Sequence, residues 1–191
     1  MRTLRHGVKP DGRPVMVMPS EDYSRLTDAD LGALVAYLRQ MPATGGGAAV
    51  VQLPLPVRVL YAFGQVQDAA EKIDHSLPPP QPVPEGATTE HGRYVAGMCV
   101  GCHGATLSGG RIPGGPPDWP VAANLTPGSG SAMAGYTDAA AFVRMMKTGQ
   151  RSDGSRIAVM PFEALSKMND NDLLGLYTYL KTLPARPVGS R

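Results

Sequence analysis

The segment Cys99-Val100-Gly101-Cys102-His103 constrains this chain more than any other feature of its sequence. It contains the only two cysteines, which lie three positions apart, and a histidine follows the second directly. Two cysteines are too few for a scaffold built on disulfides. A three-residue spacing on a helix places both thiols on one face, with the imidazole beside them. The segment therefore presents two reactive thiols and a metal-ligating nitrogen to a common neighbour.

Four interpretations of this motif compete. A structural zinc ion needs four ligands, and His6, His75 and His91 offer no second pair at a matching spacing. A thioredoxin-like redox pair belongs in a βαβ unit, and no segment alternates with period two for long enough to predict a strand. A disulfide would close a very small loop and stabilise little. The fourth interpretation is covalent attachment of a c-type haem, for which Cys-x-x-Cys-His is the recognised pattern, and we favour it.

A haem held by His103 needs a second axial ligand, and the methionines after the motif are the candidates. They are Met133, Met145, Met146, Met160 and Met168. Met145 and Met146 fall within an expected helix, and Met168 is expected to pack on Leu173 at the start of another. Met160 lies in an irregular stretch before Pro161, which stiffens the chain. We predict Met160 as the ligand, with Met133 as the alternative.

Histidine and methionine ligation favours electron transfer over catalysis. A thioether ligand raises the reduction potential of haem iron, and with both axial positions filled the iron has no vacant site for a substrate. A different class of function, a haem-based sensor or a haem enzyme, would require a labile distal position. Ready CO binding would identify that alternative.

The expected secondary structure is all-α with long loops. Thr89 is expected to cap a helix from Glu90 to about Gly101, and Thr137 a helix over 138–147. Asn169 is expected to cap the last helix, whose leucines form one apolar stripe. A connecting helix is expected over 57–72. The 23 glycines and 19 prolines are consistent with long irregular segments between these helices.

An internal repeat relates the two ends of the chain. Residues 6–42 align with 148–184 at a constant offset of 142 without a gap. Matched positions include Gly7, Asp11-Gly12, Val17-Met18-Pro19, Asp28, Leu31, Tyr37-Leu38 and Pro42. Identities at turn, cap and core positions indicate a duplicated unit. Met18 of the first copy is equivalent to Met160 of the second. The same offset would place the first copy's cysteine motif before Met1.

The repeat predicts three regions. Residues 1–45 form a partial domain that lacks its attachment motif, 46–87 form a Pro/Gly-rich connector with one helix, and 88–191 form a complete domain. We expect the chain to be truncated at its N-terminus, and we expect residues 1–7 not to begin a signal peptide, because no apolar region follows their charges. The final helix of the first copy, about 28–40, then has an apolar face without its usual partner. We expect it to pack on the second domain or the connector, or to be poorly ordered.

Composition excludes some classes of function. Hydrophobic residues make up 42% of the chain but aromatic residues only 6%, so the core is built from aliphatic side chains or around a large apolar cofactor. The net charge of +2 is spread without basic runs, which argues against nucleic-acid binding. The sequence contains no run of 18 apolar residues, so it does not predict a membrane-spanning helix.

Together these residues resemble a class I c-type cytochrome, in particular the second domain of a dihaem cytochrome such as the cytochrome c subunits of membrane-associated dehydrogenases. The similarity covers 88–184 as a whole domain and 6–42 as half of one. Its carriers are Gly92-Arg93-Tyr94, the cysteine motif, Asn124-Leu125-Thr126-Pro127, Val159-Met160-Pro161 and Tyr179-Leu180. In such cytochromes short helices wrap around one covalent haem, and the first helix packs across the last near Gly92.

The resemblance implies one haem c, bound through Cys99 and Cys102 with His103 and Met160 as axial ligands, and a propionate hydrogen bond from Asn124 or Thr126. It implies a protein that is not itself an enzyme but a subunit of an oxidoreductase complex. Such a subunit relays electrons from a dehydrogenase to an oxidase or cytochrome of a respiratory chain. It implies a periplasmic location, with membrane association through a missing segment or a partner subunit. A truncated apo fragment without function is the remaining alternative.

Overall fold

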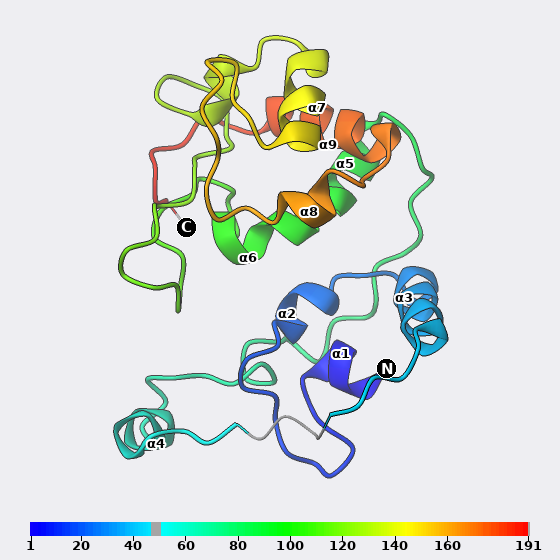
Figure 1. Ribbon diagram of the computed structural model, residues 1–191, viewed down its shortest axis with the longest axis vertical. Coiled ribbons are helices and arrows are strands. Elements are labelled where there is room, and N and C mark those ends of the chain that lie inside the picture. Colours follow the sequence, from blue (N-terminus) through cyan, green and yellow to red (C-terminus); the bar gives the residue numbers. More distant parts are fainter. Residues whose placement is uncertain (47–50, 191) are drawn as a thin grey trace. The chain divides into compact units, whose positions relative to one another are not determined.

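The computed structural model describes residues 1–46 and 51–190, and the chain divides into two compact units, Met1–Pro82 and Val83–Arg191. In the described residues the regular structure is helical, and β pairing is limited to isolated bridges. The expectation of an all-α chain is confirmed at this level. The two units are described separately below (Figure 1).

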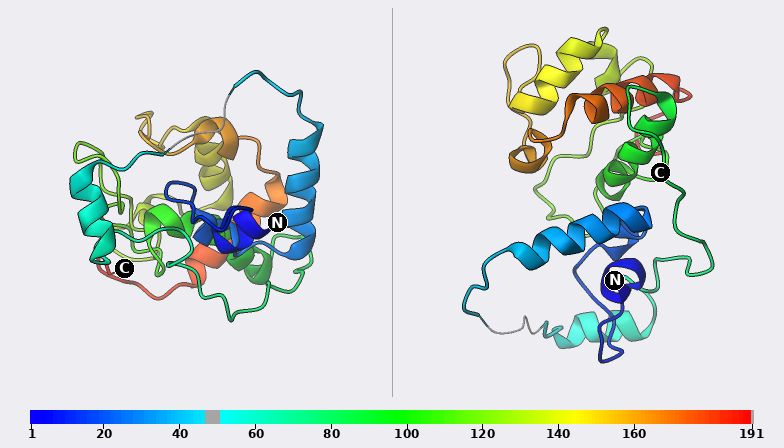
Figure 2. Two further views of the ribbon diagram at one scale, coloured as in Figure 1. Left: turned by 90° about the horizontal axis from the view of Figure 1, so that it is seen from below. Right: turned by 90° about the vertical axis from the view of Figure 1, so that its right-hand side faces the viewer.

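The second unit is organised around two crossed helices, α5 (Thr89–Ala96) and α9 (Asp170–Thr182), which lie side by side in all views (Figure 1 and Figure 2). Its other helical segments are η1 (Gly97–Cys99), α6 (Val100–His103), η2 (Ala132–Gly135), α7 (Ala139–Thr148) and α8 (Phe162–Leu165). Leu173, Leu176 and Leu180 of α9 are buried together with Phe142 and Met145 of α7. This apolar cluster holds α5, α7 and α9 in one core.

Glycine permits the close crossing of α5 and α9. A Cβ atom placed on Gly92 would lie 1.8 Å from the carbonyl oxygen of Gly175 and 2.9 Å from Cβ of Tyr179. No side chain fits at that distance, so the two backbones touch only because position 92 has none. The expected contact of Gly92 with the last helix is confirmed.

Two expected helix starts are wrong by one residue, and one is confirmed. Thr88, not Thr89, caps α5 by accepting from the His91 amide at 3.1 Å. Asp138, not Thr137, caps α7 by accepting from the Ala141 amide at 2.8 Å. In both cases two adjacent residues are good caps, and the backbone selects the one in extended conformation. Asn169 caps α9 as expected, accepting from the Asp172 amide at 2.7 Å.

The repeat is reproduced in three dimensions at the same offset of 142. In the first unit α2 (Ser20–Tyr23) and α3 (Asp28–Gln40) match α8 and α9 residue for residue. The bridge between Val8 and Pro14 matches that between Gln150 and Arg156. Gly7 ends α1 (Arg2–His6) with φ 65°, and Gly149 ends α7 with φ 69°. The shared sequence positions therefore specify shared turns and caps.

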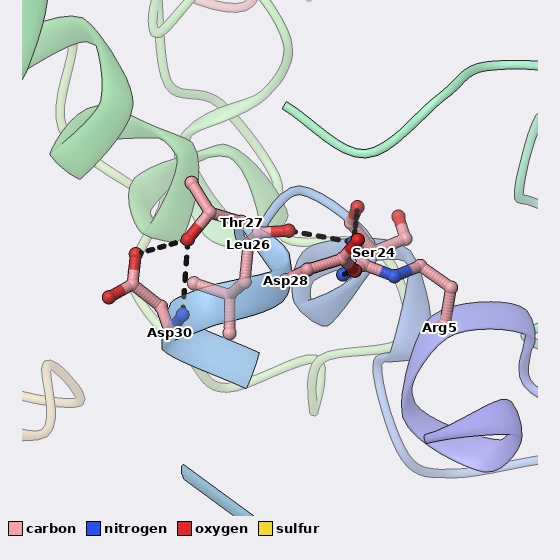
Figure 3. Close-up of polar contacts among 6 residues, drawn as sticks. All are labelled: Arg5, Ser24, Leu26, Thr27, Asp28 and Asp30. Carbon is pink, nitrogen blue, oxygen red and sulfur yellow. Dashed lines mark hydrogen bonds and ion pairs between the residues drawn. The ribbon is translucent and has the colours of Figure 1, made fainter. Parts of the chain in front are cut away.

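Arg5 fixes the start of α3 in the first unit (Figure 3). Its guanidinium donates to the carbonyl oxygens of Ser24 and Leu26 at 2.8 and 2.7 Å and pairs with Asp28 at 2.7 Å. Thr27 caps the helix by accepting from the Asp30 amide at 3.1 Å. One side chain of α1 thus satisfies the carbonyl groups of the turn that leads into α3.

Part of the connector packs within the first unit. The Ala69 amide donates to the Val15 carbonyl at 2.9 Å, and Lys72 pairs with Glu21 at 3.1 Å. The connecting helix is shorter than expected: α4 spans Leu55–Ala62, and Gly64, with φ 69°, turns the chain directly after it. The expected helix over 57–72 is wrong beyond that glycine.

The apolar face of α3 is covered only in part. Leu31 is fully buried like its counterpart Leu173, but Leu38 is 50% exposed where its counterpart Leu180 is 1% exposed. Tyr37 is exposed as well. Only the N-terminal half of α3 therefore packs into the core of the first unit.

Candidate haem site

The second unit contains a cavity of about 340 Å³ with predominantly apolar walls. Cys99, Cys102, His103 and Met160 all line it, which brings together the four residues singled out as haem ligands from two distant parts of the sequence. Further lining comes from Val95 of α5, Met146 of α7 and Leu176 of α9. Cavities of this size and polarity are typical of sites for cofactors and small molecules.

The two thiols reach the cavity because the chain stays helical through the motif. Cys99 ends η1 and Cys102 lies in α6, so about one helical turn separates them. Cys99 is half-buried and Cys102 is exposed, and both line the cavity. Gly104, with φ 81°, ends the helix directly after His103.

His103 is oriented by a backbone carbonyl. The imidazole is 6% exposed, and its Nδ1 lies 2.7 Å from the carbonyl oxygen of Ala123. A carbonyl can only accept, so Nδ1 carries the proton and the lone pair of the neutral ring is on Nε2. A hydrogen bond of this kind fixes the tautomer and ring orientation of metal-ligating histidines. The sequence contains no sign of this contact, because nothing in the residues around Ala123 predicts the path of its carbonyl.

Met160 is held in a tight, irregular loop. Its amide donates to the Ala158 carbonyl at 3.0 Å, and its carbonyl accepts from the Phe162 amide at 2.9 Å. The preceding residue, Val159, has φ 75°, which is rare for a β-branched side chain. Backbone strain of this kind concentrates at functional positions.

The other methionines divide between the cavity and the core. Met133, the alternative ligand from the sequence, is 1% exposed, and it packs in the core instead of lining the cavity. Met98, Met146 and Met168 line the cavity beside Met160. Met98 comes from the same segment as the cysteines, and Met146 lies in a helix of the core.

Asn124 and Thr126 have other partners. The Asn124 amide nitrogen donates to the Arg186 carbonyl at 2.7 Å, while its oxygen accepts from the amide and hydroxyl of Thr126 at 2.9 and 2.8 Å. The Thr126 hydroxyl in turn accepts from the Arg186 amide at 3.1 Å. Both side chains are buried and neither lines the cavity. They fasten the C-terminal segment, and their contact with a propionate stays a prediction.

The charged residues on the cavity wall are Arg151 and Arg156. Both belong to the short turn between α7 and α8, where Arg151 donates to the Ser155 hydroxyl and to the Arg156 carbonyl, each at 3.1 Å. Ser155 also contacts Asp153, whose carboxylate accepts from the Ser155 amide at 2.9 Å. There the Ser155 hydroxyl, followed by its amide, lowers the pKa of the Asp153 carboxyl through hydrogen bonding. Sequence reasoning missed both arginines, because the residues between them read only as a turn.

This donor set fits a haem. Two thiols can take up covalent links, an oriented imidazole and a thioether can ligate iron, and an apolar cavity can bury a porphyrin. Two arginines offer cationic partners for carboxylates. A donor set of this kind is typical of cytochromes.

Comparison with known proteins agrees with that class. No family model matches the chain. The chain is 25% identical over 210 residues to the fructose dehydrogenase cytochrome subunit of Gluconobacter japonicus, an alignment that covers 97% of this chain. The chain spans 40% of the length of that relative. This similarity supports a relationship to cytochromes. In the described residues no helix is both long and apolar enough to cross a membrane.

Proposed function

We propose that the chain transfers electrons through one haem c, linked covalently to Cys99 and Cys102 and ligated by His103 and Met160. The observation that carries this proposal is the convergence of these four side chains on one apolar cavity. Cys99 and Met160 are separated by 61 positions in the sequence, so only the fold brings them together. The haem would supply a one-electron redox couple.

The chain's own residues have definite tasks in this function. The Ala123 carbonyl holds the His103 ring with Nε2 as the ligating nitrogen. The loop around Met160 presents the thioether, which favours the reduced iron. Val95, Met146 and Leu176 give the cavity an apolar wall. A site that fills both axial positions of the iron leaves electron transfer as its chemistry.

The partners follow from the relative's name. A subunit of a dehydrogenase receives electrons from that enzyme, so this chain would be an electron-transfer component and not itself a catalyst. It would pass the electrons to an oxidase or another cytochrome of a respiratory chain. We place it in the periplasm, where haem is attached to motifs of this kind, with membrane association through a partner subunit or a further segment.

The first test is covalent haem. The full chain is produced in a host that attaches haem to exported proteins, denatured, and stained for haem on a gel. One haem per chain is expected for the native sequence and none after replacing both Cys99 and Cys102 by alanine. Absence of stain in the native chain, with the two thiols joined as a disulfide, would contradict the proposal and favour an apo fragment.

The second test separates electron transfer from a sensor or enzyme. Met160→Leu removes the proposed ligand, and Met98→Leu is the matched control, because both methionines line the cavity. The native chain and M98L should bind CO poorly in the ferrous state, and M160L should bind it readily with a lower reduction potential. Equal and ready CO binding by all three chains would indicate a labile distal position and overturn the assignment of Met160.

A further inference from the structure

We infer that Arg156 anchors the haem by pairing with a propionate carboxylate at the edge of the cavity, and that its charge raises the reduction potential of the iron. This inference rests on the proposed function, since it concerns the same cavity. It differs from the expectation for Asn124 and Thr126, whose polar groups are paired with each other and with Arg186.

The chemistry of the cavity wall singles out the arginines. The two propionates are the only ionised substituents on the porphyrin ring, and carboxylates near an apolar surface need cationic or hydrogen-bonding partners. The lining contains no Ser, Thr, Asn, Gln, Lys or Tyr side chain among the described residues, and Arg151 and Arg156 are its only permanent charges. Arginine binds carboxylates in a two-pronged manner, which fixes orientation as well as charge.

Of the two arginines, Arg156 has the uncommitted guanidinium. Nη1 of Arg151 already donates to the Ser155 hydroxyl and the Arg156 carbonyl, so Arg151 closes the turn and positions the backbone of Arg156. The Arg156 guanidinium makes no hydrogen bond or ion pair with the part of the chain that the structure describes. Its five N–H donors remain available for a ligand.

The repeat indicates that the turn itself does not require this arginine. The equivalent bridge of the first unit joins Val8 to Pro14, and Pro14 stands at the position of Arg156. The turn forms there with hydrogen bonds at the same positions, for example Lys9 to Arg13 in place of Arg151 to Ser155. A guanidinium at position 156 is therefore an addition in the unit that carries the cysteine motif.

Other titratable groups near this edge bear on the pH dependence. On the cavity wall they are Cys99, Cys102, His103 and Arg151. Asp153 and Tyr136 lie close enough to Arg151 to be affected by its charge. A substitution at position 156 leaves all of these side chains in place, so a change in the pH profile that Arg156→Lys reverses would report on the propionate carboxylate.

The test is a spectroelectrochemical titration of the full haem-loaded chain across pH. Arg156→Gln should lower the reduction potential at neutral pH, because an unpaired carboxylate favours ferric iron. Acidification protonates the propionate and so raises the potential. In R156Q this rise should occur at higher pH, because the propionate has lost the positive charge that favours its ionised form. Arg156→Lys should restore most of both effects. Arg144→Gln, on the exposed side of α7 and outside the cavity lining, removes the same charge elsewhere and should change neither.

The outcomes distinguish the two proposals. If the native chain carries haem and R156Q matches R144Q in both potential and pH profile, Arg156 is not the anchor and the proposed function stands. If R156Q fails to retain haem, the result for R156K is decisive. An R156K chain that carries haem with the native potential supports Arg156 as the propionate anchor. Loss of haem in R156K as well would show that Arg156 has a structural role and would overturn the inference. A native chain without haem contradicts the proposed function itself.

Discussion

At the scale of single residues, Val159 is a position where backbone conformation and side chain conflict. Its φ of 75° is a conformation that glycine adopts readily and other residues do not. At an ordinary position alanine is more stable than glycine by about 0.5–1 kcal/mol. The loop that presents Met160 therefore contains one strained residue.

We predict that at position 159, unlike at an ordinary position, a glycine variant is more stable than an alanine variant. Val159→Gly and Val159→Ala remove the same interactions beyond Cβ, but only glycine relieves the strain. V159G should be more stable than V159A by about 1 kcal/mol, measured from chemical denaturation midpoints. A more stable V159A would mean that the backbone relaxes without cost.

Tyr61 carries the largest resolved change in pKa. Its hydroxyl donates to the Asp68 carboxylate at 2.6 Å, and this hydrogen bond raises the pKa of Tyr61 to about 12. The bond ties α4 to the turn that Asp68 begins, where the Asp68 carboxylate also accepts from the Ala70 amide at 2.8 Å.

The raised pKa predicts a pH dependence. A group whose pKa is higher in the folded state stabilises it below the unfolded pKa, so this contribution is complete below about pH 10 and is lost as pH rises through about 12. Phenolate absorbance, taken as the difference from Tyr61→Phe, should show Tyr61 ionising near the upper value. Asp68→Asn should move that ionisation to lower pH. An unchanged titration would mean that the bond does not persist in solution.

At the scale of elements, the crossing of α5 and α9 decides the geometry of the candidate haem site. The cysteine motif continues directly from α5, so the contact at Gly92 sets where both thiols lie relative to α9. The first unit has no equivalent of α5 in the described residues, and Leu38 on its α3 remains half exposed.

We predict opposite effects for two glycine substitutions. Gly92→Ala places Cβ against the Gly175 carbonyl and should destabilise the second unit by about 1–3 kcal/mol or more. Gly32→Ala, inside α3 with no atom within 4 Å of the new Cβ, should stabilise the first unit by about 0.5–1 kcal/mol. Thermal or denaturant unfolding followed by circular dichroism measures both. A neutral G92A would show that the helices can separate freely.

At the scale of the whole molecule, the two units have separate cores. The hydrophobic cluster around α9 draws all its members from the second unit. All the residues that line the cavity of the candidate site also belong to that unit.

We therefore predict that residues 83–191 fold and bind haem alone. The fragment should carry one covalent haem with the reduction potential of the full chain, and it should lose haem when Cys99 and Cys102 are replaced. Haem staining and spectroelectrochemistry compare the two chains. A fragment that is exported but unfolded would show that the first unit contributes to the site.

Much of this arrangement was predictable from local sequence. The cysteine motif predicts its own chemistry because a helical turn fixes the spacing of the thiols. The repeat predicts matching helices, because caps and turn glycines act over a few residues: α3 and α9 begin and end at equivalent positions. The errors at Thr89 and Thr137 arose where two neighbouring residues could cap equally well.

Long-range contacts required the tertiary structure. The Ala123 carbonyl orients His103 across 20 positions, and Asn124 pairs with Arg186 across 62. Neither contact has a local pattern, because backbone groups look alike in any sequence. The sequence by itself determined which residues we propose as haem-binding residues. Only the folded chain determined which groups orient them and that Arg156, rather than Asn124, faces the cavity, because those choices depend on where distant segments meet.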